Sequence, residues 1–181
     1  MLLETPHASL LLIDIQERLL PAMAEPQQVL AKSAILLAAA RALGLPVTVS
    51  EQYPKGLGHT VADLSGHGGQ VFEKLSFSCW RDAAMKQHFI SLHEGGRPQV
   101  IVAGIEAHVC VLQSCIDLSA AGFGVFAVSD AMSSRQADAA TLAFERLRAF
   151  GVEVINTEMA LFELLEKAGT PQFKALSALI K

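Results

Sequence analysis

The segment Val100–Cys115, VIVAGIEAHVCVLQSC, decides the fold prediction because its character changes twice within a few residues. Residues Gln99–Ile105 form an apolar run that predicts a buried strand. The polar residues Glu106–His108 interrupt this run, and a second apolar stretch, Val109–Ala121, predicts a helix that ends before a glycine. The thiol of Cys110 lies at the beginning of this helix. A buried strand that leads through a turn into a helix is typical of α/β proteins.

The same alternation of strand and helix extends over the whole chain. Further strands are predicted at Ser9–Ile15, Val47–Ser50, Gln70–Glu73, Gly124–Val128 and Val152–Ile155. Further helices are predicted at Gln27–Leu43, Asp82–Leu92 and Arg135–Phe150, with two short C-terminal helices split by Gly169, Thr170 and Pro171. Such alternation implies right-handed crossovers. The predicted fold class is therefore α/β, a three-layer doubly wound fold with a mainly parallel six-stranded sheet and helices on both faces. In the helix Arg135–Phe150, we expect Leu142, Leu147 and Phe150 to face the sheet.

The bulk composition restricts the classes of partner. The chain has 181 residues, of which 51% are hydrophobic, and this predicts one domain that spans residues 1–181. The net charge of −4, with no run of Lys or Arg, disfavours nucleic acid as a partner. The apolar stretch Ser33–Ala40 is too short to span a membrane, and the N-terminus does not resemble a signal peptide. Three cysteines without a CxxC motif indicate a reducing, cytoplasmic location.

Three reactive residues fall at one edge of the predicted sheet. Asp14 closes the first strand, Lys74 follows the third strand, and Cys110 follows the fourth strand. Ligands of doubly wound proteins bind outside the carboxyl ends of the strands, where these side chains are expected to meet. Each residue alone has a structural explanation, because Asp14 could cap a turn and Lys74 could be solvated. Their coincidence at one edge favours catalysis.

The three side chains have complementary chemistry. A thiol at a helix N-terminus is exposed to the positive end of the helix dipole, which favours the thiolate. A carboxylate can accept the thiol proton, and an ammonium group can keep that carboxylate ionised. Asp14, Lys74 and Cys110 would thus supply a base, an orienting cation and a nucleophile. Cys79 and Cys115 are interpreted as core residues.

Other functional motifs are incomplete. No GxGxxG or GxSxG motif is present, and no cofactor is expected. His59 and His67 share a loop with Glu51 and Asp63, but their spacing matches no known zinc pattern. A phosphoacceptor receiver domain also has an Asp at a strand end, but it requires further acidic residues that Ile13 and Glu73-Lys74 do not supply.

Four motifs resemble those of the isochorismatase-like cysteine hydrolases, a superfamily that includes nicotinamidases and N-carbamoylsarcosine amidohydrolases. They are LLLIDIQERL, FEKLSFSCW, VIVAGIEAHVCVLQSC and VFAVSDAMSSR, and the resemblance extends over nearly the whole chain. The resemblance implies a catalytic triad of Asp14, Lys74 and Cys110. In this family the thiolate attacks an amide-like carbonyl, an amine leaves, and water cleaves the thioester. The implied activity is hydrolysis of C–N bonds other than peptide bonds.

The resemblance also implies an oxyanion hole formed by the backbone N–H groups of Glu106 and Cys110, and a cis peptide bond between Ile105 and Glu106. Nicotinamidases carry a metal-binding Asp-x-His motif where this chain has Glu51, Gln52 and Tyr53. The sequence therefore resembles a metal-free branch of the family, and no metal ligands are predicted.

The resemblance implies a small amide or a related carbonyl compound as substrate, and a small, partly aromatic set of candidate pocket residues fits a compact compound of this kind. These residues are Gln16, Leu19, Tyr53, Phe77, Trp80 and His108. The resemblance favours a homo-oligomer, and the C-terminal apolar stripe of Phe173, Leu176, Leu179 and Ile180 could contact a partner chain or cover the protein's own sheet. A catalytically silent module that keeps the fold for oligomer contacts remains an alternative.

Overall fold

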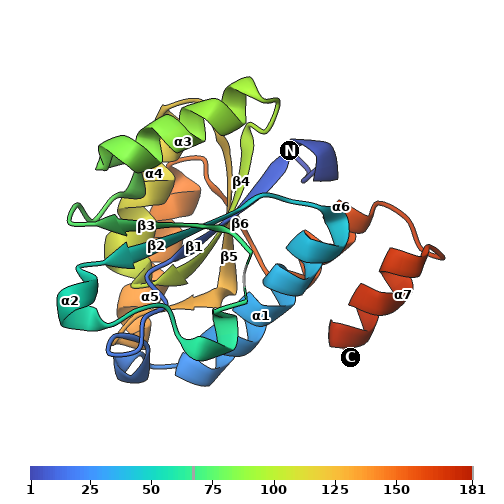
Figure 1. The fold of residues 1–181 in the computed structure, drawn as a ribbon. Coiled ribbons are helices and arrows are strands. Elements are labelled where there is room, and N and C mark those ends of the chain that lie inside the picture. Colours follow the sequence, from blue (N-terminus) through green and yellow to red (C-terminus); the bar gives the residue numbers. More distant parts are fainter. Residues whose placement is uncertain (67, 181) are drawn as a thin grey trace.

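The computed structural model describes residues 1–66 and 68–180 and has a six-stranded sheet in which every neighbouring pair of strands is parallel. The strand order is β3-β2-β1-β4-β5-β6 (Figure 1). The strands are β1 (Ala8–Ile13), β2 (Val47–Gln52), β3 (Gln70–Lys74), β4 (Gln99–Ile105), β5 (Gly124–Ser133) and β6 (Glu153–Ile155).

Helices cover both faces of the sheet. One face carries α1 (Pro26–Leu43), α6 (Thr157–Leu165) and α7 (Pro171–Ser177), and the other carries α3 (Ala83–Glu94), α4 (Leu112–Ala120) and α5 (Ala137–Ala149) (Figure 1). The short helix α2 (Pro54–Leu57) follows β2, and 3₁₀ turns lie at Thr5–His7, Leu20–Ala22, Ala62–Leu64, Cys79–Arg81 and Ala178–Ile180. The predicted three-layer doubly wound fold is confirmed. Within the described residues, no helix combines the length and apolar character needed to cross a bilayer.

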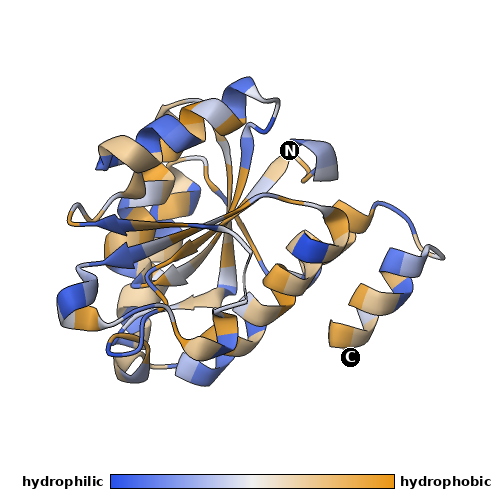
Figure 2. Cartoon of the chain, viewed as in Figure 1, coloured by the Kyte–Doolittle hydropathy of each residue, from blue (hydrophilic) through white to orange (hydrophobic). Residues whose placement is uncertain are grey.

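Alternating residues of the central strands build two separate cores. On β1, Leu10 and Leu12 pack with the helices of the α1 side, whereas Leu11 and Ile13 pack with those of the α4 side. Every residue of β1 is buried, as expected for a parallel strand covered on both faces. In contrast, β2 and β3 become hydrophilic at their carboxyl ends, where functional side chains gather (Figure 2).

Two expectations about helix faces need correction. Leu147 is buried, but Leu142 and Phe150 are 58% and 50% exposed. The inner face of α5 is instead formed by Leu147 with the small residues Ala140 and Ala143, which lie one helical turn apart.

The C-terminal apolar stripe packs mostly on the protein's own core. Leu176 is buried, and Phe173 and Ile180 pack against the cluster that contains α1 and α6, whereas Leu179 is 44% exposed. The stripe therefore packs within its own chain through three of its residues, but it covers the helices α1 and α6 and not the sheet that was expected.

The strand order places the catalytic candidates at a topological switch point. The chain proceeds from β1 outward to β3 and then crosses back to β4, so β1 and β4 are neighbours although distant in sequence. The connections from these two strands run in opposite directions, and this opens a crevice at their carboxyl ends. Asp14 follows β1, and the turn Glu106–Cys110 follows β4.

Gly104 allows β4 to approach β1 immediately before this crevice. Its φ is 134°, and a Cβ at this position would collide with the backbone oxygen of Ile13. The pairing of β4 with β5 shifts in register between Val102 and Gly104. A side chain at position 104 would therefore push apart the two strands that carry Asp14 and Cys110.

We expect Gly104→Ala to lower the free energy of unfolding by about 2–3 kcal/mol, because both the steric conflict and the positive φ disfavour a Cβ. Urea denaturation would measure this loss. Gly122→Ala is the matched control, because Gly122 also has a positive φ, 95°, but nothing lies within 4 Å of its added Cβ. Equal losses in the two variants would contradict the role given to the close approach.

Candidate active site

Asp14 is held in one orientation by contacts to both of its oxygens. The residue adopts a left-handed conformation with φ 53°, and its side chain is fully buried. Its Oδ1 accepts a hydrogen bond of 2.7 Å from the Ser50 hydroxyl, and its Oδ2 lies 2.8 Å from the Lys74 ammonium nitrogen. Ser50 belongs to β2, whose backbone also fixes the Asp14 N–H through a bond of 3.1 Å.

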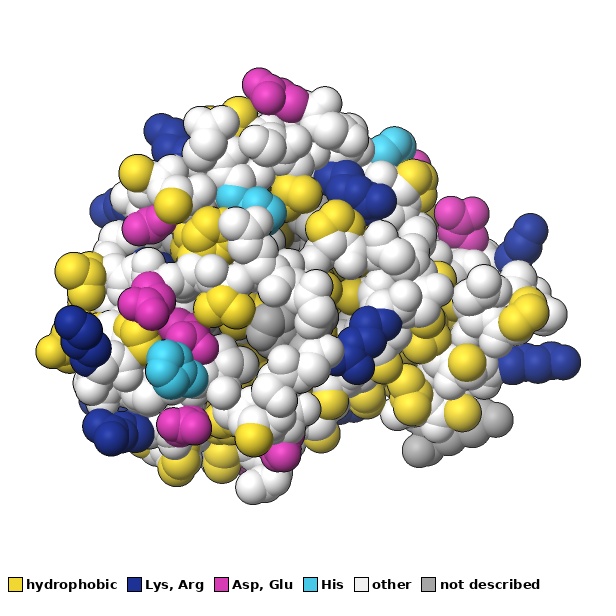
Figure 3. Space-filling view, viewed as in Figure 1, with side chains coloured by type: hydrophobic (Ala, Val, Ile, Leu, Met, Phe, Trp, Pro, Cys, Tyr) yellow, Lys and Arg dark blue, Asp and Glu magenta, His cyan; other side chains and the backbone are white. Residues whose placement is uncertain are grey.

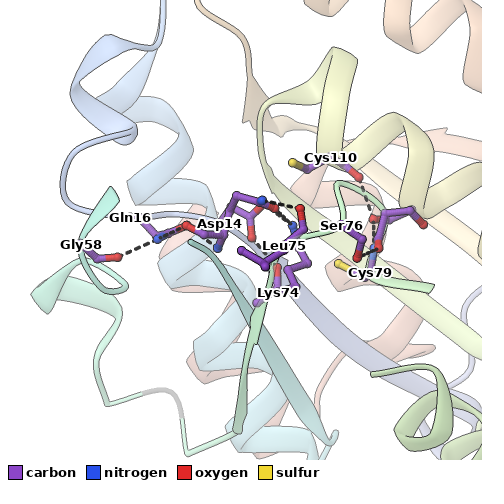
Figure 4. Close-up of polar contacts among 12 residues, drawn as sticks. Asp14, Gln16, Gly58, Lys74, Leu75, Ser76, Cys79 and Cys110 are labelled. Carbon is purple, nitrogen blue, oxygen red and sulfur yellow. Dashed lines mark hydrogen bonds and ion pairs between the residues drawn. The ribbon is translucent and has the colours of Figure 1, made fainter. Parts of the chain in front are cut away.

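Lys74 is the last residue of β3, and its ammonium group reaches across β2 to Asp14 (Figure 4). It also donates a hydrogen bond of 2.7 Å to Oε1 of Gln52, its register partner on β2. Burial opposes the charged form of Lys74, but the charge on Asp14 leads the effects that raise its pKa above the ordinary value. Lys74 is therefore an ammonium ion at neutral pH.

Cys110 lies in a π-helical turn, Ala107–Val111, that leads into α4. It is only 5% exposed, and its thiol lies within the electrostatic influence of Asp14 and Lys74. Burial raises the pKa of Cys110, and the negative charge of Asp14 raises it further, whereas Lys74 opposes the shift. These effects favour the protonated thiol and oppose the influence of the helix N-terminus, which favours the thiolate.

The peptide bond between Ile105 and Glu106 is cis, at the position where the family resemblance implies one. The carbonyl of Glu106 accepts hydrogen bonds from the N–H groups of Val109 and Val111, at 3.1 and 3.2 Å. Its carboxylate accepts from the backbone N–H and the side-chain Nε of Arg135. These contacts fix the turn on both sides, whereas the oxyanion role of the Glu106 and Cys110 N–H groups stays a prediction.

Gln16 was predicted to line the pocket, but its amide is fully engaged in holding a loop. Its nitrogen donates to the carbonyls of Gln52 and Gly58, at 3.0 and 2.6 Å, and its oxygen accepts from the Gln52 N–H at 2.8 Å. Figure 4 shows Gln16 beside Asp14 and in contact with Gly58. Gln16 therefore supports the residues around Asp14 and has no free group for a substrate.

The other predicted pocket residues lie in different places. Tyr53 lines a cavity of about 500 Å³ that reaches Lys74, and Phe77 is 54% exposed. His108 borders two further cavities. Leu19 packs against the α1 core instead.

Trp80 lies in a separate cavity of about 200 Å³ with Ile90 and His93. Its ring centroid is 5.7 Å from that of Phe123, and the Lys86 ammonium group lies 5.3 Å from the ring. These contacts give Trp80 a packing role between α3 and α4.

Glu51 occupies the position where nicotinamidases carry the first metal ligand, but here it ties down a loop. The buried carboxylate accepts hydrogen bonds from His59 Nδ1 at 2.9 Å, from the Thr60 N–H at 2.7 Å and from the Thr60 hydroxyl at 2.8 Å. Burial raises the pKa of Glu51, but these hydrogen bonds outweigh it and lower the pKa overall. Among residues 1–66 and 68–180, no group of three or more His, Cys, Asp or Glu could hold a metal, and His67 lies outside them. The residues present do not fit a metal.

The remaining cysteines are fully buried. Cys79 and Cys115 are each 0% exposed, and burial raises the pKa of Cys79 to about 11. The Ser114 hydroxyl accepts from the Cys79 N–H and donates to the Cys110 carbonyl, at 2.9 and 2.7 Å. This bridge joins the 3₁₀ turn after β3 to the Cys110 turn.

Sequence reasoning missed three residues that the structure places around the site: Ser50, Gln52 and Arg135. Ser50 and Gln52 are polar residues at the end of β2, and this position was a usable signal. To use this signal, one must know that β2 lies between β1 and β3 in the sheet. Only that strand order places the side chains of Ser50 and Gln52 between Asp14 and Lys74.

A doubly wound sheet with a buried carboxylate, an ammonium group and a thiol at its switch point places a candidate active site where proteins of this α/β class bind ligands. The model of the Isochorismatase domain matches residues 8–159. The chain therefore belongs to the isochorismatase family, as the resemblance of its motifs implied.

Known relatives agree with this assignment. Isochorismatase domain-containing protein 2 of Danio rerio is 39% identical over 179 residues, which cover 98% of this chain and 89% of the relative. The structure of MAR1 ribonuclease from Caenorhabditis elegans matches with a TM-score of 0.91 and 33% identity, over 99% of this chain and 92% of that one. The Escherichia coli YcaC gene product, described as an octameric hydrolase of unknown specificity, matches with a TM-score of 0.90 over 99% of this chain and 90% of that one. Because the identity to YcaC is 21%, that likeness shows the fold alone.

Proposed function

We propose that residues 1–181 form a single isochorismatase-like domain that hydrolyses a small amide or a related C–N carbonyl compound, with Cys110 as nucleophile. The buried Asp14–Lys74 ion pair, whose two charges both act on the Cys110 thiol, carries this proposal. A protonated thiol becomes a nucleophile when it loses its proton during attack, and Asp14 is the proposed acceptor of that proton.

The proposed reaction has two halves. As the sulfur bonds to the carbonyl carbon, the thiol proton passes to Asp14 and the carbonyl oxygen becomes an oxyanion. The N–H groups of Glu106 and Cys110 stabilise this oxyanion. The C–N bond then breaks, and Asp14 returns the proton to the leaving amine. Water attacks the thioester, Asp14 accepts its proton, and the proton returns to the sulfur as the acid leaves.

Lys74 has two tasks in this reaction. Its ammonium group balances the charge on Asp14, which burial would otherwise disfavour. The second hydrogen bond of Lys74, to Gln52, fixes the ammonium group against β2. The Asp14 carboxylate bound to this ammonium group therefore keeps a constant orientation towards Cys110.

A screen of small amides and carbamoyl compounds tests the function, with Cys110→Ala as the blank. Release of ammonia or amine by the native protein and not by the variant supports a cysteine hydrolase. The alternative is a catalytically silent module, for which no compound would be turned over and no cysteine would show enhanced reactivity towards alkylation.

The name of the Caenorhabditis elegans structure raises ribonuclease activity as a second possibility, but the charge distribution does not favour it. The net charge is −4, and Lys and Arg side chains on the face in Figure 3 are separated by acidic and hydrophobic ones. RNA binding needs a continuous basic surface.

We also propose that the protein is a homo-oligomer. A structural neighbour is octameric, and exposed Leu142 and Phe150 leave apolar surface on the outside of α5. Light scattering should give a mass that is a multiple of 19.3 kDa. Leu142→Glu should lower this mass, whereas Thr141→Glu, at the adjacent exposed position, should not. A wild-type monomer at working concentration would refute the proposal.

A further inference from the structure

The Cys110 turn borders a second cavity whose lining is rich in hydrogen-bond donors. This cavity has a volume of about 350 Å³ and is lined by His108, Arg135, Gln136 and Ala139. His108 comes from the turn that carries Cys110, and Arg135 and Gln136 connect the end of β5 to α5. Because β5 is the neighbour of β4 in the sheet, both sides of the cavity are attached to the same sheet edge as Cys110.

Arg135 is fixed in this cavity by a buried carboxylate. Its backbone N–H and its Nε both donate to one Glu106 oxygen, at 3.1 and 3.0 Å. The Glu106 side chain is 10% exposed, whereas that of Arg135 is 65% exposed. Since Nε is occupied, the two terminal nitrogens of the guanidinium group keep their donors for another acceptor. The Glu106 carboxylate thus orients the guanidinium group through Nε and leaves the edge with the two terminal nitrogens accessible.

The other polar groups of the lining leave hydrogen-bonding atoms for a ligand as well. His108 Nδ1 lies 2.9 Å from the Ser134 hydroxyl, and this contact fixes the ring. Neither the His108 Nε2 nor the Gln136 amide has a hydrogen-bond partner among residues 1–66 and 68–180. A guanidinium edge beside an imidazole and an amide suits a carboxylate, which accepts several hydrogen bonds in one plane.

We infer that this cavity binds a carboxylate group of the substrate and that Arg135 is the residue that selects it. The inference rests on the proposed function and narrows its substrate class to small amides or carbamoyl compounds that also carry a carboxylate. Glu106 connects the Arg135 cavity to the Cys110 turn, because its carboxylate binds Arg135 and its backbone belongs to the turn that positions Cys110.

Two alkylating reagents that differ in charge test this inference at Cys110. Iodoacetate and iodoacetamide modify the same sulfur, but only iodoacetate carries a carboxylate. Rates at Cys110 are obtained by peptide mapping, and each is divided by the rate of free cysteine with the same reagent. We expect the normalised preference for iodoacetate to fall about tenfold in Arg135→Gln, because the charge attraction is lost.

Two further variants serve as controls. Arg135→Lys keeps the charge but not the planar fork, so it should retain part of the preference. Arg148→Gln removes an exposed arginine at the opposite end of α5 and should leave the preference unchanged. An identical preference in the wild type and in Arg135→Gln would overturn the inference.

A second measurement needs no reaction at the thiol and so separates this inference from the proposed function. Succinate should raise the midpoint of thermal unfolding more than the same concentration of succinamide, at constant ionic strength. The difference should disappear in Arg135→Gln and persist in Arg148→Gln. Equal effects of the two compounds on the wild type would refute the carboxylate site. A retained difference together with an unreactive Cys110 would uphold the site and refute the proposed hydrolase.

Discussion

Cys110→Ala should lose at least about three orders of magnitude in turnover of any substrate that the native protein hydrolyses, because no other group can form the covalent intermediate. Cys110→Ser should be nearly as inactive, since a hydroxyl is far less acidic than a thiol. Both variants should fold, because the substituted side chain remains small.

Cys115→Ala is the matched control for Cys110→Ala. Cys115 is fully buried in α4, so its truncation should cost some stability but leave turnover of the folded protein close to that of the wild type. Iodoacetamide should label Cys110 before Cys79 and Cys115, because Cys110 is 5% exposed and the other two are 0% exposed. Preferential labelling of either buried thiol would refute the assignment of the nucleophile.

Asp14→Asn should lower turnover by about two to four orders of magnitude, because the amide keeps the shape of the side chain but cannot accept the thiol proton. The structure adds a second effect. Asp14 and Lys74 are both fully buried at their side chains, so the variant leaves an ammonium group without its counter-charge. Loss of one partner of a buried pair destabilises a protein by about 3–5 kcal/mol.

The double variant Asp14→Asn/Lys74→Met separates these two effects. The double variant contains no buried ammonium group without a counter-charge, so its free energy of unfolding should return towards that of the wild type. Turnover should remain as low as in Asp14→Asn. Chemical denaturation and initial rates, measured on the same preparations, distinguish the outcomes. Near-native turnover in Asp14→Asn would show that Asp14 is a packing residue.

The sequence predicted the sheet well because its central strands are buried on both faces. Continuous apolar runs such as Gln99–Ile105 have few other interpretations in an α/β chain. The inner face of α5 was harder to predict, because Ala140 and Ala143 carry little hydrophobic signal. Large residues such as Leu142 dominate the pattern even where they face solvent.

The sequence predicted only those site residues that lie at the ends of strands. Asp14, Lys74 and Cys110 each follow or end a strand, and parallel strands bring such positions to one edge. Gln52 and Arg135 were missed, because their roles depend on which strands are neighbours. The protonation of Cys110 could not be predicted for a similar reason, since it depends on burial and on nearby charges, and neither can be read from spacing.

Lys74 stands on β3, a strand of five residues at the margin of the sheet that is paired with β2. Asp14 and Cys110 follow the two central strands, β1 and β4, whereas the cation of the site comes from a strand at the margin that has one neighbour in the sheet. The charge balance of the site therefore depends on the pairing of β3 with β2, while most of the buried hydrophobic residues lie on other elements.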